Sequence, residues 1–249
     1  MKRILVGPRA VTEGLRASAG QIHVVYLPAD GRKALRSLAD DAARRGVRVE
    51  ERTQSELDAL ARGHKHQGVV AITGEYNYAE LEQVLHGAAQ PPMLVALDQI
   101  TDPHNFGAIV RSAVAFGADG VIIMKKRAAP VTPVVVRASA GATEHARIVR
   151  ITNLSRTLAA LIDEGMQAVG LDAEGDVDLN ELPPAPAGRV LVVGAEGSGL
   201  RRLVRERCTH LARIAHPGPV ASLNASVAAS IALFAAARQR GVERSAMPT

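Results

Sequence analysis

Polar side chains that could do chemistry are concentrated in three stretches of the chain, residues 98–111, 194–200 and 214–226. Each stretch follows a short apolar run that predicts a buried strand. In parallel sheets, ligands bind beyond the carboxyl ends of the strands, so these stretches are where a ligand is expected. Five of their polar residues are candidates for a role in chemistry: Asn105, Arg111, Glu196, Ser222 and Asn224.

The first stretch contains the start of a helix predicted over residues 105–116 and closed by Gly117. Asn105 is the predicted N-cap, and Arg111 is expected on the same face of the helix two turns later. Capping alone would account for Asn105. A surface or ion-paired position would account equally well for Arg111.

The second stretch, Gly194-Ala-Glu-Gly-Ser-Gly-Leu200, follows a buried strand and opens a helix, as nucleotide-binding loops do. Its glycines do not complete a dinucleotide-binding pattern, because Arg202 stands where the last glycine is needed, and the Gly-Lys-Ser/Thr of a Walker loop is absent. Glu196 would repel a pyrophosphate. The loop therefore suits a ligand without phosphate, such as a sulfonium or an ammonium. A tight turn without a ligand is the alternative.

The third stretch turns through two prolines and a glycine and leads into a helix over residues 224–240. The prolines favour a rigid loop, and Ser222 or Asn224 is the expected N-cap. The helix is rich in Ala and Ser, so another backbone can approach it closely. A capped, buried helix at the end of a sheet is the other interpretation.

Strand–helix alternation predicts an α/β fold. In the first part of the chain, strands are expected at residues 4–6, 22–27, 47–50 and 69–73, with helices at 9–17, 33–45, 55–61 and 78–86. Further strands are expected at residues 93–97, 120–124, 147–151, 167–171, 189–193 and 210–215. Two more helices are expected at 155–164, capped by Ser155, and at 200–207, whereas 132–140 fits either a strand or a helix. This alternation predicts a mostly parallel sheet with helices on both faces.

A helix breaker and a double proline in residues 87–92 indicate a boundary between domains. The predicted division is a small α/β domain at residues 1–76, a linker at 77–92 and a larger α/β domain at 93–249.

The excess positive charge lies in the first part of the chain. The 249 residues have a formal net charge of +5. Residues 1–74 hold 13 Lys and Arg against 8 Asp and Glu, and the remaining residues hold 17 of each. This predicts a polyanion such as RNA bound by the N-terminal part, with a solvated basic surface as the alternative. The chain has three Tyr, three Phe and no Trp, so contact through phosphate and shape is favoured over base stacking.

Residues 64–67, His-Lys-His-Gln, lie in the loop before the strand expected at 69–73. No carboxylate or cysteine is adjacent to the two histidines, so a metal site is not expected. Contact with RNA phosphate or ribose and an ordinary polar loop fit this segment equally well.

The chain has no apolar run near the ~20 residues of a membrane span, and its first residues lack the apolar segment of a signal peptide. A single cysteine, Cys208, excludes an internal disulfide and a Cys-based zinc site. These features predict a cytoplasmic protein with neither a metal nor a membrane partner.

Three motifs together resemble those of the SpoU/TrmH family, in the same order: Asn105-Phe-Gly-Ala-Ile-Val-Arg-Ser-Ala, Gly194-Ala-Glu-Gly-Ser-Gly-Leu and Ser222-Leu-Asn-Ala-Ser-Val-Ala-Ala. Members of this family are S-adenosylmethionine-dependent RNA ribose 2′-O-methyltransferases of the SPOUT class. The N-terminal part resembles the family's L30e-like substrate-binding domain. The whole chain is most similar to the RlmB type, which methylates a guanosine in 23S ribosomal RNA.

The resemblance implies a trefoil-knotted C-terminal domain and a homodimer in which the partner chain completes each site. It implies S-adenosylmethionine as cofactor, bound by Gly194, Glu196, Gly197, Gly199, Ile214, Ser222 and Leu223. It also implies a reaction site lined by Arg111, Asn105, Glu196, Ser222 and Asn224. One departure is Ala215-His216, where relatives commonly carry Pro-Met, and we expect it to alter the rim of the cofactor pocket.

Arginine is effectively always protonated in proteins, which disfavours Arg111 as a general base. We expect it to clamp a substrate phosphate and to stabilise developing alkoxide charge, with Asn105 orienting Arg111 and the ribose. A tRNA ribose methyltransferase and a resistance-conferring ribosomal RNA methyltransferase share this chemistry. A non-catalytic RNA-binding or ribosome-assembly protein on the same fold is the alternative from a different class.

Overall fold

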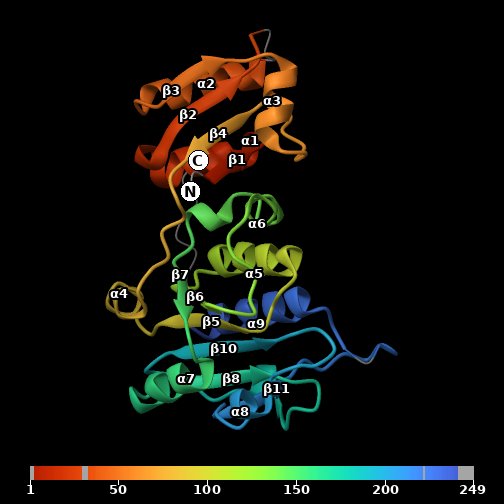
Figure 1. Ribbon diagram of the computed structural model, residues 1–249. Coiled ribbons are helices and arrows are strands. Elements are labelled where there is room, and N and C mark those ends of the chain that lie inside the picture. Colours follow the sequence, from red (N-terminus) through yellow and green to blue (C-terminus); the bar gives the residue numbers. More distant parts are fainter. Residues whose placement is uncertain (1–2, 30–32, 221, 241–249) are drawn as a thin grey trace. The chain divides into compact units, whose positions relative to one another are not determined.

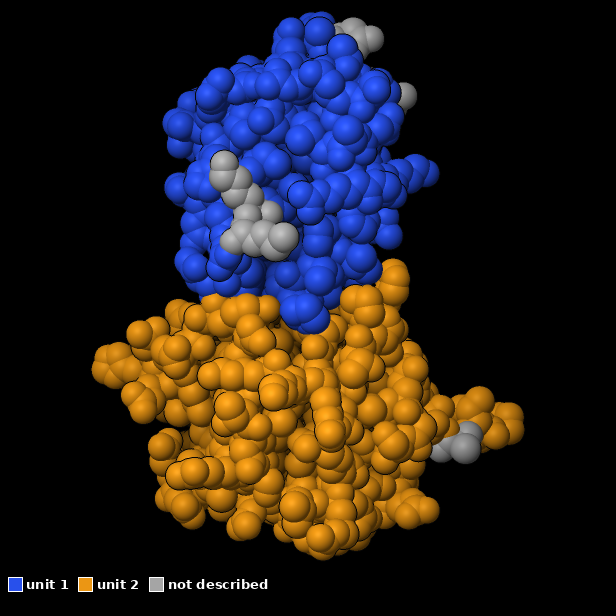
Figure 2. Space-filling view, in the orientation of Figure 1, with its two compact units in different colours: residues 1–77, 130–145 blue, residues 78–129, 146–249 orange. Residues whose placement is uncertain are grey.

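Two sheets organise the chain, one in each of two compact units (Figures 1 and 2). The structure is a computed structural model that describes residues 3–29, 33–220 and 222–240. The first unit comprises residues 1–77 and 130–145, and the second comprises residues 78–129 and 146–249. The chain therefore returns to the first unit after entering the second, which the predicted division of the chain did not include.

The first unit contains a four-stranded sheet in the order β1 (Arg3–Val6), β4 (Val70–Thr73), β2 (Ile22–Leu27) and β3 (Arg48–Glu51). Strand β4 is antiparallel to both β1 and β2, and β3 is parallel to β2. As a result, β1, β2 and β3 all end at the edge of the sheet where β4 begins.

Helices cover both faces of this sheet. Helices α1 (Pro8–Ser18) and α2 (Lys33–Arg44) share one buried cluster with Leu5 of β1, whereas α3 (Gln54–Ala61) shares another with Ile4. Neighbouring residues of β1 enter different clusters because successive side chains of a strand point to opposite faces. The strands and helices predicted for residues 4–73 are confirmed to within one residue at each end.

The returning segment, residues 130–145, is held to the first unit by its helix α6 (Pro133–Ala138) and by the short turn Ala142–Glu144. Thr132 caps α6, accepting a hydrogen bond from Val135 N at 3.4 Å, so the ambiguous stretch is a helix. Val136 joins the buried cluster of α1 and α2.

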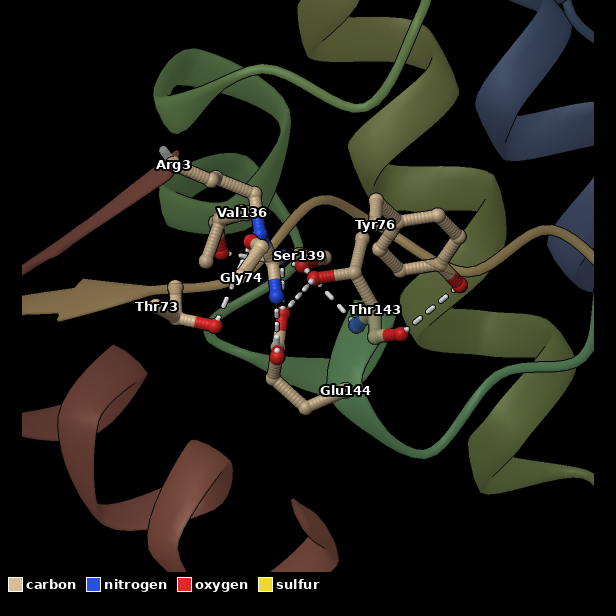
Figure 3. Close-up of polar contacts among 8 residues, drawn as sticks. All are labelled: Arg3, Thr73, Gly74, Tyr76, Val136, Ser139, Thr143 and Glu144. Carbon is tan, nitrogen blue, oxygen red and sulfur yellow. Dashed lines mark hydrogen bonds and ion pairs between the residues drawn. The ribbon is translucent and has the colours of Figure 1, made fainter. Parts of the chain in front are cut away.

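A buried ion pair adds a polar anchor for this segment (Figure 3). Arg3 Nη1 and Nη2 donate to the two carboxylate oxygens of Glu144 at 2.7 and 2.8 Å, and the two side chains are only 8% and 2% exposed. Thr143 Oγ1 donates to Glu144 at 3.2 Å, and the Tyr76 hydroxyl donates to the carbonyl oxygen of Thr143 at 3.0 Å. The Arg3 guanidinium also lies 5.2 Å from the ring centre of Tyr76.

The second unit contains a seven-stranded sheet in which every neighbouring pair is parallel. Its order is β7 (Ile148–Ile151), β6 (Gly120–Met124), β5 (Met93–Asp98), β10 (Arg189–Gly194), β8 (Gln167–Leu171), β11 (His210–Arg213) and β9 (Val177–Asp178). The predicted parallel sheet is confirmed, although β9 was not expected.

Helices lie on both faces of this sheet as well (Figure 1). One face is covered by α4 (Leu81–His86), α7 (Leu154–Asp163) and α8 (Arg202–Arg205). Helices α5 (Pro103–Ala115) and α9 (Ala225–Gln239) pack against each other and against the central strands β5, β6 and β10. None of the helices in the described ranges is long and apolar enough to cross a membrane.

The start of α5 differs from the prediction. Asp102, not Asn105, is the N-cap, and its carboxylate accepts a hydrogen bond from His104 N at 3.0 Å. Pro103 fits the first helical position because its fixed φ suits a helix and its missing N–H is not needed there.

Two other helix starts follow the same capping chemistry. Asn153, not Ser155, caps α7, accepting from Arg156 N at 3.1 Å. Asn224 caps α9, as one of the two predicted alternatives.

We predict that Arg3→Ala lowers the free energy of unfolding by about 3–5 kcal/mol, because it leaves the buried Glu144 carboxylate without its partner. The double variant Arg3→Met/Glu144→Met should lose less, since neither charge remains buried. Urea denaturation measures both. An equal or larger loss in the double variant would contradict the assignment of the effect to the unpaired carboxylate.

Candidate functional site

A cavity of about 460 Å³ lies at the carboxyl ends of β8, β10 and β11 in the second unit. Its walls come from the loops that follow these three strands and from the first turns of α9. All seven residues predicted to contact a cofactor line it: Gly194, Glu196, Gly197, Gly199, Ile214, Ser222 and Leu223.

The glycine-rich loop is a tight turn. Ala195 N donates to the carbonyl oxygen of Gly199 at 3.1 Å, and Gly199 N donates back to Ala195 at 2.9 Å. A Cβ on Gly194 would lie 2.3 Å from the Gly199 carbonyl carbon, so no side chain fits there. Gly197 has a φ of 77° and Gly199 a φ of 64°, which favour glycine.

Three predicted polar residues meet beside this turn. Asn105 Nδ2 donates to Glu196 Oε1 at 3.1 Å, and Asn224 Nδ2 donates to Asn105 Oδ1 at 3.1 Å. Asn224 Nδ2 also donates to Glu196 Oε1. Asn105 is buried, whereas Glu196 and Asn224 are exposed. The glycine-rich loop, the first turn of α5 and the start of α9 are therefore joined through one carboxylate oxygen.

Asn224 has a second role in local structure. Its Oδ1 accepts hydrogen bonds from Ser226 N at 2.9 Å and from Val227 N at 3.3 Å, which caps α9. Because one amide supplies both the cap and the bonds to Glu196 and Asn105, the start of α9 is fixed relative to the glycine loop.

Arg111 is not part of this group. It is exposed on α5, and its guanidinium makes no hydrogen bond or ion pair with the residues that the structure describes. The expectation that it shares a helix face with Asn105 is wrong. Six residues advance a helix by about 600°, which leaves the two side chains roughly 120° apart around the axis.

The cavity also contains charged residues that the sequence analysis did not single out. Asp172 and Glu174, from the loop after β8, and Arg205 of α8 line it. Arg205 Nε donates to Asp172 Oδ2 at 2.7 Å, and this bond lowers the pKa of Asp172. Asp172 directly follows a predicted buried strand, which is the signal that could have identified it.

Another residue that the sequence did not single out, Asp98, supports the chain that follows the glycine-rich loop. Asp98, at the end of β5, is fully buried and accepts hydrogen bonds from Arg201 N at 2.9 Å and Arg201 Nε at 2.7 Å. This pair fixes the chain directly after the glycine loop.

The cavity is suited to a cationic rather than a phosphorylated ligand. Two neutral amides contact Glu196, so they do not compensate its charge. Of the basic side chains in the lining, Arg205 is already bonded to Asp172 and His216 is bonded to two backbone carbonyl oxygens. Burial raises the pKa of Cys208 to about 12, so it stays a thiol and is no nucleophile. Within the described ranges, no group of three His, Cys, Asp or Glu residues is arranged to hold a metal.

His216 lies in the wall of the cavity, between β11 and α9. Its Nδ1 lies 2.9 Å from the carbonyl oxygen of Ile214, and its Nε2 lies 3.0 Å from that of Val220. Carbonyl oxygens only accept, so both ring nitrogens must carry protons to form both bonds. The carbonyl of Ile214, followed by that of Val220, raises the pKa of His216 above its ordinary value of 6.5.

We predict that His216 titrates above pH 6.5 in NMR spectra of the folded protein. Since its folded pKa is raised, its contribution to stability is complete below the unfolded pKa and is lost as the pH rises through the folded pKa. The stability difference between the wild type and His216→Gln should shrink over the same pH range. A midpoint below 6.5 would contradict the two-donor arrangement.

Known families match both parts of the chain. The SpoU rRNA methylase family matches residues 92–234, and the family for RNA 2′-O ribose methyltransferase substrate binding matches residues 4–79. An uncharacterised tRNA/rRNA methyltransferase of Mycolicibacterium vanbaalenii is 45% identical over 241 residues, covering 95% of this chain and 76% of the relative.

Solved structures of methyltransferases are similar to the whole chain. The SpoU methyltransferase AviRb from Streptomyces viridochromogenes, in complex with AdoMet, superposes with a TM-score of 0.79 at 27% identity, covering 98% of this chain and 92% of AviRb. An AdoMet-bound rRNA methyltransferase from Sinorhizobium meliloti gives 0.77 at 27% identity, covering 95% and 87%. With three polar loops joined at Glu196 and both families matched, the chain belongs to the SpoU rRNA methylase family.

Proposed function

We propose that the protein transfers a methyl group from S-adenosylmethionine to the ribose 2′-hydroxyl of a guanosine in 23S ribosomal RNA. The observation that carries the proposal is the group Asn105, Glu196 and Asn224, held beside the cavity at the carboxyl edge of the parallel sheet. Membership of the SpoU family and the AdoMet bound to two similar methyltransferases support it.

The residues of the cavity fit S-adenosylmethionine. We assign its binding to Gly194, Glu196, Gly197, Gly199, Ile214, Ser222 and Leu223, which all line the cavity. When bound, S-adenosylmethionine supplies an electrophilic methyl group on a positively charged sulfur. The uncompensated carboxylate of Glu196 favours such a charge, and the tight glycine turn brings backbone groups to the cavity without side chains in the way.

The residues of the site act mainly by positioning. Aligning the attacking hydroxyl with the methyl group contributes several powers of ten in rate. Asn105 and Asn224 fix Glu196 by its Oε1 atom, and Glu196 Oε2, which has no partner among the described residues, is the atom that we assign to a hydrogen bond from the ligand. Ser222 lines the cavity from the α9 side. Asn105 thus orients the Glu196 carboxylate. The sequence had predicted instead that Asn105 orients Arg111 and the ribose.

Arg111 is assigned to the substrate. Its exposed guanidinium is available to grip a phosphate of the RNA and to stabilise negative charge that develops on the 2′-oxygen. Its permanent charge disfavours a role as base, so the proton of the 2′-hydroxyl is released to solvent as the C–S bond breaks, the new C–O bond forms and S-adenosylhomocysteine leaves.

We also propose a homodimer formed through the knotted second domain. Along α9, Val227, Ile231 and Phe234 recur at helical spacing and are 46%, 37% and 48% exposed. An apolar stripe of this kind on a solvent-facing helix fits a second copy of the same surface. Arg111 lies on the adjoining helix α5, so the partner chain would complete the substrate side of the site.

The two family matches support separate roles for the two parts of the chain. We propose that residues 1–76, with the returning segment 130–145 packed against them, are the RNA substrate-binding domain, and that the rest of residues 93–249 is the trefoil-knotted methyltransferase domain, acting in the cytoplasm on ribosomal RNA processing. Residues 77–92, predicted as the linker, include helix α4, which packs on the sheet of the second unit. The term tRNA/rRNA in the names of similar proteins supports tRNA as the second candidate substrate.

Mass spectrometry of nuclease-digested RNA tests the substrate. A strain lacking the gene should lose one 2′-O-methylguanosine from 23S ribosomal RNA, and a plasmid copy should restore it. Loss of a ribose methyl group from tRNA instead would establish the second candidate. Unchanged methylation in both RNA classes would favour a non-catalytic RNA-binding protein.

We predict that Arg111→Ala and Arg111→Lys both lose methyl transfer by on the order of 10²-fold, because lysine keeps the charge but lacks the planar fork. Single-turnover transfer to ribosomal RNA fragments measures this loss. Binding of S-adenosylhomocysteine, measured by calorimetry, should change little. Turnover near that of the wild type in Arg111→Lys would show that charge alone suffices.

We predict that Glu196→Gln weakens binding of S-adenosylmethionine about fivefold more than binding of S-adenosylhomocysteine, whose sulfur carries no positive charge. Glutamine keeps an acceptor oxygen for the two amides but removes a charge worth about 1 kcal/mol at 4 Å in water. Glu174→Gln, on the β8 loop of the same cavity, is the matched control and should discriminate less. Equal losses for both ligands in Glu196→Gln would exclude a charge effect.

A further inference from the structure

The cations of the first unit divide into two sets. In the described part of residues 1–74, carboxylates form ion pairs with Arg3, Arg16, Arg44, Arg45, Arg48 and Arg52. Exposed cations without a carboxylate partner among the described residues are Arg9, Arg36, Arg62 and Lys65. The second set therefore offers to solvent four positive charges that no carboxylate of the described residues pairs with.

The second set lies at one edge of the sheet, where β1 and β2 end and β4 begins. Arg9 is in the first turn of α1, which follows β1, and Arg36 is in the first turn of α2, which follows β2. Arg62 and Lys65 lie in the loop of residues 62–68, which leads into β4.

The ion-paired arginines lie mostly at the opposite edge. Arg16 and Arg44 are in the last turns of the same two helices, and Arg48 begins β3. Arg3 begins β1, and Arg52, which follows β3, is the exception.

The loop of residues 62–68 and Val69, which follows it, contact the starts of both helices. Gly7, directly before α1, donates its N–H to the carbonyl oxygen of Val69 at 3.0 Å. A Cβ on Gly68 would lie 2.8 Å from Leu35 Cδ1 in α2. We call the surface formed by Arg9, Arg36, Arg62 and Lys65 the basic edge.

The loop is held by contacts of a buried histidine, His66. His66 is 4% exposed, its Nδ1 accepts from Gly68 N at 3.1 Å, and its Nε2 lies 3.0 Å from Asp58 Oδ1. Gly63 and Gly68 have φ values of 81° and 86°. His66 is thus a structural anchor, whereas its neighbours His64 and Lys65 face outward to different degrees. A fixed loop avoids part of the ordering cost of binding.

The chemistry of this unit favours phosphate over bases. Its two tyrosines, Tyr26 and Tyr76, each have an arginine close to the ring, with Arg52 at 4.9 Å and Arg3 at 5.2 Å from the ring centres. One face of each ring is therefore covered by an arginine and is not an open stacking platform of the kind that single-strand binders use. Arginine and lysine side chains without carboxylate partners are the usual ligands of nucleic-acid phosphates.

We propose that the basic edge is the surface of the first unit that binds the sugar–phosphate backbone of the substrate RNA, an inference that rests on the proposed function. The basic edge consists of four named side chains and a loop anchored by His66. The distribution of charge along the sequence had indicated only that the N-terminal part binds a polyanion. Contacts of this kind position the RNA and do not read its sequence.

The test compares two full-length double variants that each remove two arginines from α1 and α2. Arg9→Gln/Arg36→Gln changes the starts of the helices, and Arg16→Gln/Arg44→Gln changes their ends. The control leaves no carboxylate without a partner, because Glu13 still contacts His145 and Asp41 still contacts Arg45. Fluorescence anisotropy with 23S ribosomal RNA fragments and with tRNA gives the affinity at several salt concentrations.

We expect Arg9→Gln/Arg36→Gln to reduce the slope of log affinity against log salt by about 1.4–1.8, which corresponds to an affinity loss on the order of 30-fold at 0.1 M salt. The control variant should keep the slope and affinity of the wild type within about twofold. Binding of S-adenosylhomocysteine should be the same in all three proteins, which shows that the second unit is intact.

If both variants lost the same slope, the basic edge would be overturned, because the net charge of the unit alone would then explain RNA binding. An unchanged slope in Arg9→Gln/Arg36→Gln would also overturn it, while the proposed methyl transfer would stand. If the wild type bound neither RNA, the proposed function itself would fall and the basic edge with it.

Discussion

The site depends on one oxygen atom, Glu196 Oε1, which accepts hydrogen bonds from the amides of both Asn105 and Asn224. Asn105 lies in the first turn of α5, Glu196 in the glycine-rich loop and Asn224 at the start of α9, and each of these three segments follows a different strand of the parallel sheet. Parallel pairing brings the ends of β5 and β10 side by side, with Gly194 in register with Asp98. The sheet thereby fixes the loops to within hydrogen-bond reach, and the shared carboxylate sets their final positions.

The two units present charges of opposite sign: the second unit presents a carboxylate to its cavity, and the first presents arginine and lysine side chains to solvent. In the second unit, a carboxylate faces a cavity whose one arginine is bonded to Asp172, an environment that suits a cation. In the first unit, carboxylates form ion pairs with the arginines at one edge of the sheet, whereas the cations at the other edge, apart from Arg52, have no carboxylate partner among the described residues. A formal net charge of +5 conceals this arrangement, because ion pairing and not composition decides which charges reach a ligand.

Much of this architecture follows from local sequence pattern. Apolar runs and helix-stop glycines placed the strands and helices, and strand–helix alternation predicted the parallel sheet with the polar loops at its carboxyl edge. Helix starts were less predictable where several capping residues compete, as Asp102 and Asn153 show. Side-chain contacts between distant segments had no local signal. The buried Arg3–Glu144 pair joins residues 141 positions apart, and the salt bridge of Asp98 with Arg201 joins residues 103 apart.

The return of residues 130–145 to the first unit gives the chain three passages between its two units, near residues 77, 129 and 145. A protease that cuts only near residue 77 would therefore not release the first unit, because the returning segment, with Val136 in its core and Glu144 bonded to Arg3, still holds it. The same arrangement limits exchange of the N-terminal part between relatives during evolution. A recombined gene must supply a matching partner for Glu144, which is encoded more than 60 residues beyond the apparent end of that part.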